Sequence, residues 1–117
     1  MTDKELLELA AKAAGIDAYW SVDGSIQRHE IFVTVAGGSH GTMPYESEWN
    51  PLKSDSDALR LAVKLGLCVD ISIGFDTTTV DYFVNEDTSL CEAHHSDPLA
   101  ATRRAIVRAA AAIGDKL

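Results

Sequence analysis

Three segments with helical hydrophobic spacing, one near each end of the chain and one in the middle, constrain the fold more than any other feature. In the first, Thr2 and Glu5 form a capping box, apolar residues recur every three or four positions, and Gly15 can end the helix. The strands must form in the two stretches between these helices. A length of 117 residues suits one domain, 1–117, with one core of ordinary size.

The middle helix is expected to end near Leu65, and three residues that favour the N-cap position precede it, namely Ser54, Asp55 and Ser56. Its apolar spacing predicts one buried stripe, made of Leu59, Ala62, Val63 and Gly66.

The last helix has a clear start, because Asp97 suits the N-cap and Pro98 suits the first helical position, where its missing N–H costs nothing. Gly114 is expected to end it. Its predicted buried stripe consists of Leu99, Thr102, Ile106, Ala109, Ala110 and Ile113.

The stretch after the first helix predicts a β-hairpin. Ala18–Val22 favours a strand, Asp23-Gly24 is a strong hairpin turn signal, and the return strand is expected over Glu30–Ala36. The following segment, up to residue 50, is expected to be an extended loop, because Pro44 is excluded from a central strand.

The stretch after the middle helix predicts a second hairpin. Apolar and polar residues alternate over 67–73, a turn is expected over 74–77, and a partner strand over 78–84, with a short further strand around 90–93. The resulting fold class is α+β, with a mostly antiparallel sheet of four or five strands and three helices in the order α-β-β-α-β-β-α. The alternation over 67–73 favours a sheet with one face covered by helices, and a sheet with helices on both faces is the alternative.

The acidic residues are unevenly distributed. The chain has 18 Asp and Glu against 10 Lys and Arg, a net charge of −8. Between Lys64 and Arg103 there is no lysine or arginine, but there are seven carboxylates, namely Asp70, Asp76, Asp81, Glu86, Asp87, Glu92 and Asp97. This balance disfavours direct DNA or RNA binding and binding to anionic membranes, and it favours a basic protein surface as the partner.

The predicted partner-binding set is Asp70, Asp76, Asp81, Glu86 and Asp87, together with Trp49. A contact surface is one interpretation of the carboxylates, and a solvated sheet edge that prevents edge pairing is the other. For Trp49 the alternatives are a structural anchor in the core and an exposed anchor for a partner.

Three arginines, Arg103, Arg104 and Arg108, are expected in the last helix. Arg104 and Arg108 are four residues apart and therefore share a helix face, which makes them a candidate anion-binding pair. Alternatively, these arginines balance the carboxylates of a neighbouring element. Arg103 is expected nearer the edge of the core.

No catalytic residues, cofactor or metal are predicted. Cys91, His94, His95 and Asp97 are residue types that can bind zinc, but no second Cys/His pair stands at a suitable spacing. The segment 37–41, Gly-Gly-Ser-His-Gly, lacks the pattern of a phosphate-binding loop or a nucleophile elbow. Cys68 and Cys91 are expected to be buried thiols rather than a disulfide.

The chain also resembles the NinX-like, or phage ABA-sandwich, family of small tailed-phage and prophage proteins. The resemblance is carried by Trp49-Asn50-Pro51-Leu52, Asp55, Asp57, Ala58-Leu59-Arg60-Leu61-Ala62, Lys64-Leu65-Gly66, and by the segments 5–10 and 98–110 of the first and last helices. The regions 17–48 and 70–97 do not contribute to it. It implies a layer of sheet flanked by helices and a phage accessory role without an established chemistry.

Together, the resemblance and the charge lead us to expect a phage-encoded binding protein that acts in the host cytoplasm. Its partner is expected to be a host protein or ribonucleoprotein with a basic groove, such as a CRISPR surveillance complex or a similar defence assembly, which the protein would inhibit stoichiometrically. The alternatives are an assembly or structural component of the phage and, less favoured, a small enzyme that uses His40, His94 or His95. A homodimer formed through a sheet edge also stays open.

Overall fold

We describe the fold from a computed structural model of the chain, which covers residues 1–36, 39–72, 77–84 and 87–117. Within 29–46, 72–78 and 81–90, only strand membership and strand pairing are described. This part of the chain forms three α-helices and six β-strands, in the order α1 (Asp3–Ala14), β1 (Ala18–Trp20), β2 (Ile26–Ala36), β3 (Ser39–Glu48), α2 (Asp55–Leu65), β4 (Cys68–Ser72), β5 (Thr77–Val84), β6 (Asp87–His94) and α3 (Pro98–Asp115).

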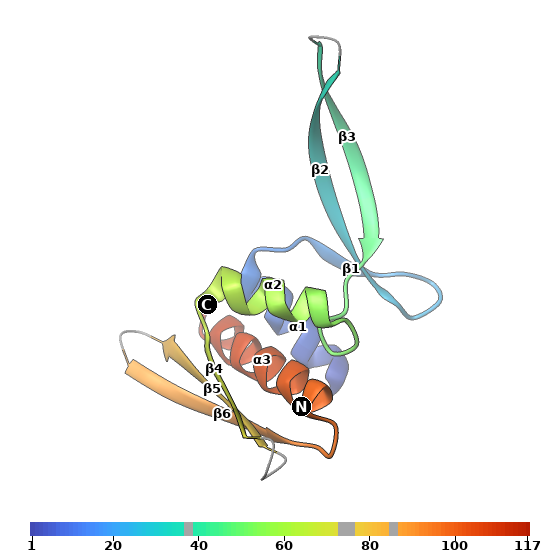
Figure 1. Cartoon of the computed structure of the whole chain (residues 1–117). Coiled ribbons are helices and arrows are strands. Elements are labelled where there is room, and N and C mark those ends of the chain that lie inside the picture. Colours follow the sequence, from blue (N-terminus) through green and yellow to red (C-terminus); the bar gives the residue numbers. More distant parts are fainter. Residues whose placement is uncertain (37–38, 73–76, 85–86) are drawn as a thin grey trace.

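The helices pack together in the centre of the molecule, between two separate antiparallel sheets (Figure 1). One sheet has the strand order β1-β2-β3 and the other β4-β5-β6. The second sheet lies against α3, whereas the β2–β3 hairpin extends away from the helices. The α+β class is therefore confirmed, but the order α-β-β-α-β-β-α and the count of four or five strands are not matched.

The caps place the helix starts where the sequence predicts them. The Thr2 hydroxyl accepts a hydrogen bond from the Glu5 N–H at 3.2 Å, and Gly15 ends α1 with a left-handed φ of 67°. Ser54 is the N-cap of α2, and Asp97 is the N-cap of α3, with Pro98 following it. Each helix therefore begins at a residue whose side chain accepts a bond from an otherwise unpaired N–H.

The predicted loop before residue 50 is instead strand β3, which pairs with β2 along its whole length. Pro44 pairs with Ile31 in this register. Because β3 is an edge strand in the order β1-β2-β3, a residue without an N–H can be accommodated there. The return strand β2 also begins at Ile26, four residues before the predicted Glu30.

In the second sheet, β6 is longer than the predicted strand around 90–93 and makes this sheet three-stranded. The predicted turn over 74–77 lies largely outside the described residues. Val80 and Ala93 are fully buried, and both β5 and β6 contact α3. The sheet is thus covered by a helix on one face, rather than forming the central layer that the family resemblance implies.

The predicted buried stripes of α2 and α3 are partly wrong. Leu59 and Val63 are 63% and 73% exposed, and Leu99 is 56% exposed. The stripe of α2 that faces the core is displaced by one position and contains Asp57, Ala58, Leu61 and Ala62. Gly66 is not part of it but ends the helix, with a φ of 64°.

Gly114 lies inside α3 rather than ending it. A Cβ at this position would come within 2.0 Å of the Leu9 carbonyl oxygen of α1. Glycine is therefore present because two helix backbones approach closely, not because the chain needs a left-handed residue.

The described residues include no helix that is both long and apolar enough to cross a membrane. The molecule is elongated, with extents of 53 × 35 × 26 Å and a radius of gyration of 15.8 Å. A compact domain of 100 residues has a radius of gyration of about 13 Å. The projecting β2–β3 hairpin accounts for the difference (Figure 1).

Candidate functional site

The face of the β4-β5-β6 sheet that points away from α3 carries exposed carboxylates. Asp70 pairs with Thr79, and Thr79 pairs with Glu92, so these three residues form one row across the sheet. Residues directly opposite each other on paired strands share a face, and successive residues alternate between faces. Since Val80 is buried toward α3, Asp70 and Glu92 lie on the opposite face, and both are exposed. We call this the outer sheet face.

Of the other predicted carboxylates, Asp81 pairs in register with Cys68, and Asp87 pairs with Val84. Their side chains lie outside the description. Asp76 and Glu86 lie outside the described residues altogether. The structure therefore brings together Asp70 and the strand position of Asp81 from the predicted set, and it adds Glu92, which the prediction omitted.

Glu92 has basic neighbours that adjust the local charge. The His94 Nε2 lies 3.6 Å from a carboxylate oxygen of Glu92, so a protonated His94 would offset part of its charge. Arg108 donates a hydrogen bond to the Glu92 carbonyl oxygen at 2.9 Å. Arg108 thus joins α3 to the backbone of β6.

Trp49 is 1% exposed and belongs to the core. The backbone N–H of Trp49 donates a hydrogen bond to the Ile26 carbonyl oxygen at 2.9 Å, which joins the start of β2 to the segment before α2. This burial fits the interpretation of Trp49 as a structural anchor in the core. The indole is not exposed for contact with a partner.

The arginines of α3 also have partners within the chain. Arg104 forms an ion pair with Asp3 at 3.1 Å, and Arg103 pairs with Asp55 at 2.6 Å. Arg103 also donates a hydrogen bond to the Leu52 carbonyl oxygen. Arg104 and Arg108 thus bond to separate elements, α1 and β6, and their role as an anion-binding pair stays a prediction.

Within the part of the chain that the structure describes, no group of three or more His, Cys, Asp or Glu residues is arranged to hold a metal ion. The His95 Nδ1 instead accepts a hydrogen bond from the Asp97 N–H at 2.9 Å, at the start of α3. Both cysteines are free thiols, but Cys68 is exposed rather than buried as predicted, and Cys91 is half-buried.

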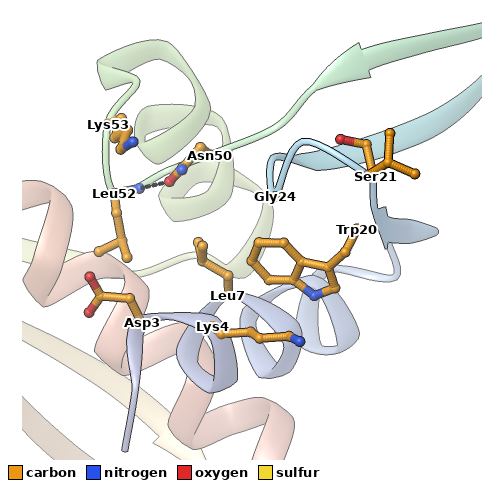
Figure 2. A pocket seen from close by; sticks show the side chains of 10 residues that line it. Asp3, Lys4, Leu7, Trp20, Ser21, Gly24, Asn50, Leu52 and Lys53 are labelled. Atoms are coloured by element: carbon orange, nitrogen blue, oxygen red, sulfur yellow. Dashed lines mark hydrogen bonds between the residues drawn. The ribbon is translucent and has the colours of Figure 1, made fainter.

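Two cavities near the start of α2 were not predicted from the sequence. The larger, of about 570 Å³, lies between α1, the β1–β2 turn and the segment before α2. Figure 2 shows Leu7, Trp20 and Leu52 around it, with Lys4 extended beside Trp20. The Lys4 ammonium lies 5.4 Å from the centre of the Trp20 ring, within the range of a cation–π interaction.

The second cavity, of about 420 Å³, is polar. Three cationic side chains line it, those of Arg28, Lys53 and Arg60. Asn50 and Lys53 line both cavities, so the two meet at the segment between β3 and α2. The lining of the larger cavity comes from three segments that are distant along the chain, so sequence spacing gave no signal for it. The second cavity is lined mainly by residues within 47–60, and Arg28 of β2 completes it.

No protein-family model, no curated protein and no solved structure matches this chain. The resemblance to the NinX-like family therefore stays a prediction.

Proposed function

We propose that this protein is a stoichiometric binding protein that places its outer sheet face against a basic surface of a partner. The observation that carries the proposal is the exposure of Asp70 and Glu92 on a sheet face that α3 does not cover. Asp70 and Glu92 lie in one row on either side of Thr79, so their backbones are two strand spacings apart, roughly 9–10 Å, and the pair offers two negative charges at a fixed separation.

The charge of the whole chain supports the same interface. A net charge of −8 repels nucleic acid and attracts a basic protein surface over distances of about one Debye length, roughly 8–10 Å at moderate salt. Electrostatic complementarity of this kind raises the association rate and selects against acidic partners. Binding should therefore weaken as the salt concentration rises.

The partner that fits this interface is a basic groove that normally holds nucleic acid. The family resemblance implies a phage origin, so we infer that the partner is a host defence complex that handles nucleic acid. By competing with nucleic acid for the groove, the protein would inhibit this complex in the manner of an anti-CRISPR protein. The protein would act in the host cytoplasm without catalysing a reaction.

Affinity capture from infected cells at low salt, followed by mass spectrometry, tests this function. Wild-type protein is expected to capture a host nucleic-acid-binding protein, and an Asp70→Asn/Glu92→Gln variant is expected to lose it. A Glu5→Gln/Asp17→Asn variant makes the same change in net charge at exposed residues outside the sheet, and it should capture the partner normally. Equal capture by both variants would overturn the assignment of the outer sheet face.

A second candidate function, a phage assembly component, is favoured by the projecting β2–β3 hairpin (Figure 1). A two-stranded hairpin is marginally stable by itself in water and gains stability when a neighbouring molecule covers it. Detection of the protein in purified virions would support this alternative, and its absence from virions together with capture of a host protein would reject it.

A further inference from the structure

The two cavities that meet at Asn50 and Lys53 differ in chemistry. The larger has an apolar wall of Leu7, Trp20 and Leu52, whereas the smaller is lined by polar side chains, namely three cations, three hydroxyls, two carboxylates and one amide. Their volumes, about 570 and 420 Å³, lie within the range of roughly 300–1,000 Å³ typical of small-molecule sites. The pair therefore has room for a ligand with one apolar part and one polar part.

The apolar cavity has an aromatic wall that is held in place. The Trp20 Nε1–H donates a hydrogen bond to a carboxylate oxygen of Glu8 at 2.9 Å, which fixes the orientation of the indole. Leu7 is buried behind the opening, and Leu52 is half-buried on the other side (Figure 2). A flat apolar group would gain contact with preformed surfaces rather than having to order them.

Three of the cations around the cavities, Lys4, Lys53 and Arg60, have no carboxylate partner among the described residues, although acidic residues are in excess. Arg28, which also lines the polar cavity, bonds to the Ser47 hydroxyl. These cations favour an anionic ligand.

The carboxylates in the same lining are largely engaged. Asp3 forms an ion pair with Arg104, and the Asp57 carboxylate accepts a hydrogen bond from the Asn50 N–H at 3.0 Å. Glu48, at the end of β3, is exposed and lines the polar cavity as the remaining acidic group. The positive groups thus outnumber the carboxylates that are available to repel an anion.

We propose that the paired cavities bind a small organic anion, in which a ring-sized apolar group is joined to a carboxylate or a phosphate. The apolar group lies against Trp20 and Leu52, and the anionic group lies near Lys53 and Arg60. This site uses none of the residues of the outer sheet face, so it stands or falls independently of the proposed partner interface.

A titration of the full-length ¹⁵N-labelled protein followed by NMR tests the site, with 1-naphthyl phosphate as the probe. The chain contains two tryptophans, so the buried Trp49 indole provides an internal control for the Trp20 indole. Saturable shifts of the Trp20 indole N–H and of the Lys53 backbone N–H are expected, with little change at the Trp49 indole. Neutral 1-naphthol should bind more weakly, and inorganic phosphate alone should leave Trp20 unshifted.

A parallel titration with 1-naphthoate separates the two anion classes. Equal affinity for 1-naphthoate and 1-naphthyl phosphate assigns the site to organic anions in general, and a marked preference for one compound assigns it to that class. Both results support the site. Equal affinity for the neutral alcohol and both anions would overturn it, as would the absence of saturable binding.

Charge-removing variants provide the matched comparison. Lys53→Gln and Arg60→Gln are each expected to weaken naphthyl phosphate binding about two- to fivefold, the effect of losing one solvent-exposed charge pair. Lys64→Gln, one turn further along α2 and outside both cavities, should leave the affinity unchanged. Equal affinities in all three variants would show that the cations do not hold the ligand.

Discussion

At the scale of single residues, the segment that precedes α2 shows why a residue type alone does not assign a role. Trp49 has the properties of both a core anchor and an interface anchor, and only its burial distinguishes them. The neighbouring Asn50 caps its own segment, since its Oδ1 accepts a hydrogen bond from the Leu52 N–H at 3.1 Å. This segment is a structural connection between β3 and α2, and its Asn50 and Lys53 line both cavities.

Replacement of the buried indole tests the core role directly. Trp49→Ala is expected to lower the free energy of unfolding by about 3–5 kcal/mol, the usual cost of removing a large buried aromatic side chain. Urea denaturation measures the change. Val22→Ala, at a fully exposed position, should change the free energy by less than about 0.5 kcal/mol. A Trp49→Ala variant with wild-type stability but no partner binding would instead support the interface alternative.

The β1–β2 turn contains a carboxylate whose titration reports on local structure. Hydrogen bonds from the Ser21 hydroxyl, followed by those from the Ser25 hydroxyl and N–H, lower the pKa of Asp23 from 3.8 to about 2. These bonds stabilise the charged form, so their contribution to stability is present above pH 4 and is lost as the pH falls through about 2.

An NMR titration of the side-chain carboxyl carbons measures this pKa. The Asp23 midpoint should lie near 2 in the wild type and move toward 3.8 in Ser21→Ala, which removes the largest cause of the shift. A midpoint near 3.8 in the wild type would contradict the hydrogen-bonded geometry of the turn.

At the scale of secondary-structure elements, the ends of the helices could be predicted better than their faces. Caps depend on residues next to each other in sequence, as with Thr2 and Glu5 in α1, so local chemistry is sufficient. The buried face depends on what packs against the helix. In α2, two stripes of apolar residues one position apart were available, and tertiary packing buries Leu61 rather than Leu59.

The strands show the same limit. The alternation over 67–73 and the Asp23-Gly24 turn predicted two hairpins, but Pro44 argued against β3 because the sequence does not reveal that β3 lies at a sheet edge. The division into two sheets, the alignment of Asp70 and Glu92 on either side of Thr79 and the larger cavity all depend on contacts between segments that are distant along the chain. These features could not be obtained from local patterns.

The contact between α1 and α3 gives a prediction at this scale. Gly114→Ala places a Cβ within 2.0 Å of the Leu9 carbonyl oxygen, so the two helices must move apart. We expect a loss of about 1–3 kcal/mol in the free energy of unfolding, as for other overpacked sites. Thermal or urea denaturation measures it, with Asp115→Ala at the next, exposed position as the control. A neutral or stabilising Gly114→Ala change would show that the helices are not in close contact there.

At the scale of the whole molecule, the projecting hairpin, the acidic outer sheet face and the cationic cavities lie in different regions. The β2–β3 hairpin extends the molecule to 53 Å, while the outer sheet face lies on the other side of the helices (Figure 1). Two lysines and two arginines surround the cavities near α2, in a chain with a net charge of −8. We therefore propose two separate binding sites, an acidic face for a basic protein and a cationic site for a small anion.

The affinity of the captured partner for charge variants, measured by calorimetry at low and high salt, tests the central claim most directly. At low salt, Asp70→Asn/Glu92→Gln should bind about tenfold or more weakly than the wild type, since both changes remove charges from the proposed contact. The Glu5→Gln/Asp17→Asn control should bind within about twofold of the wild type, and high salt should reduce the difference between the variants. Wild-type affinity in a folded Asp70→Asn/Glu92→Gln protein would contradict the proposal that the outer sheet face binds the partner.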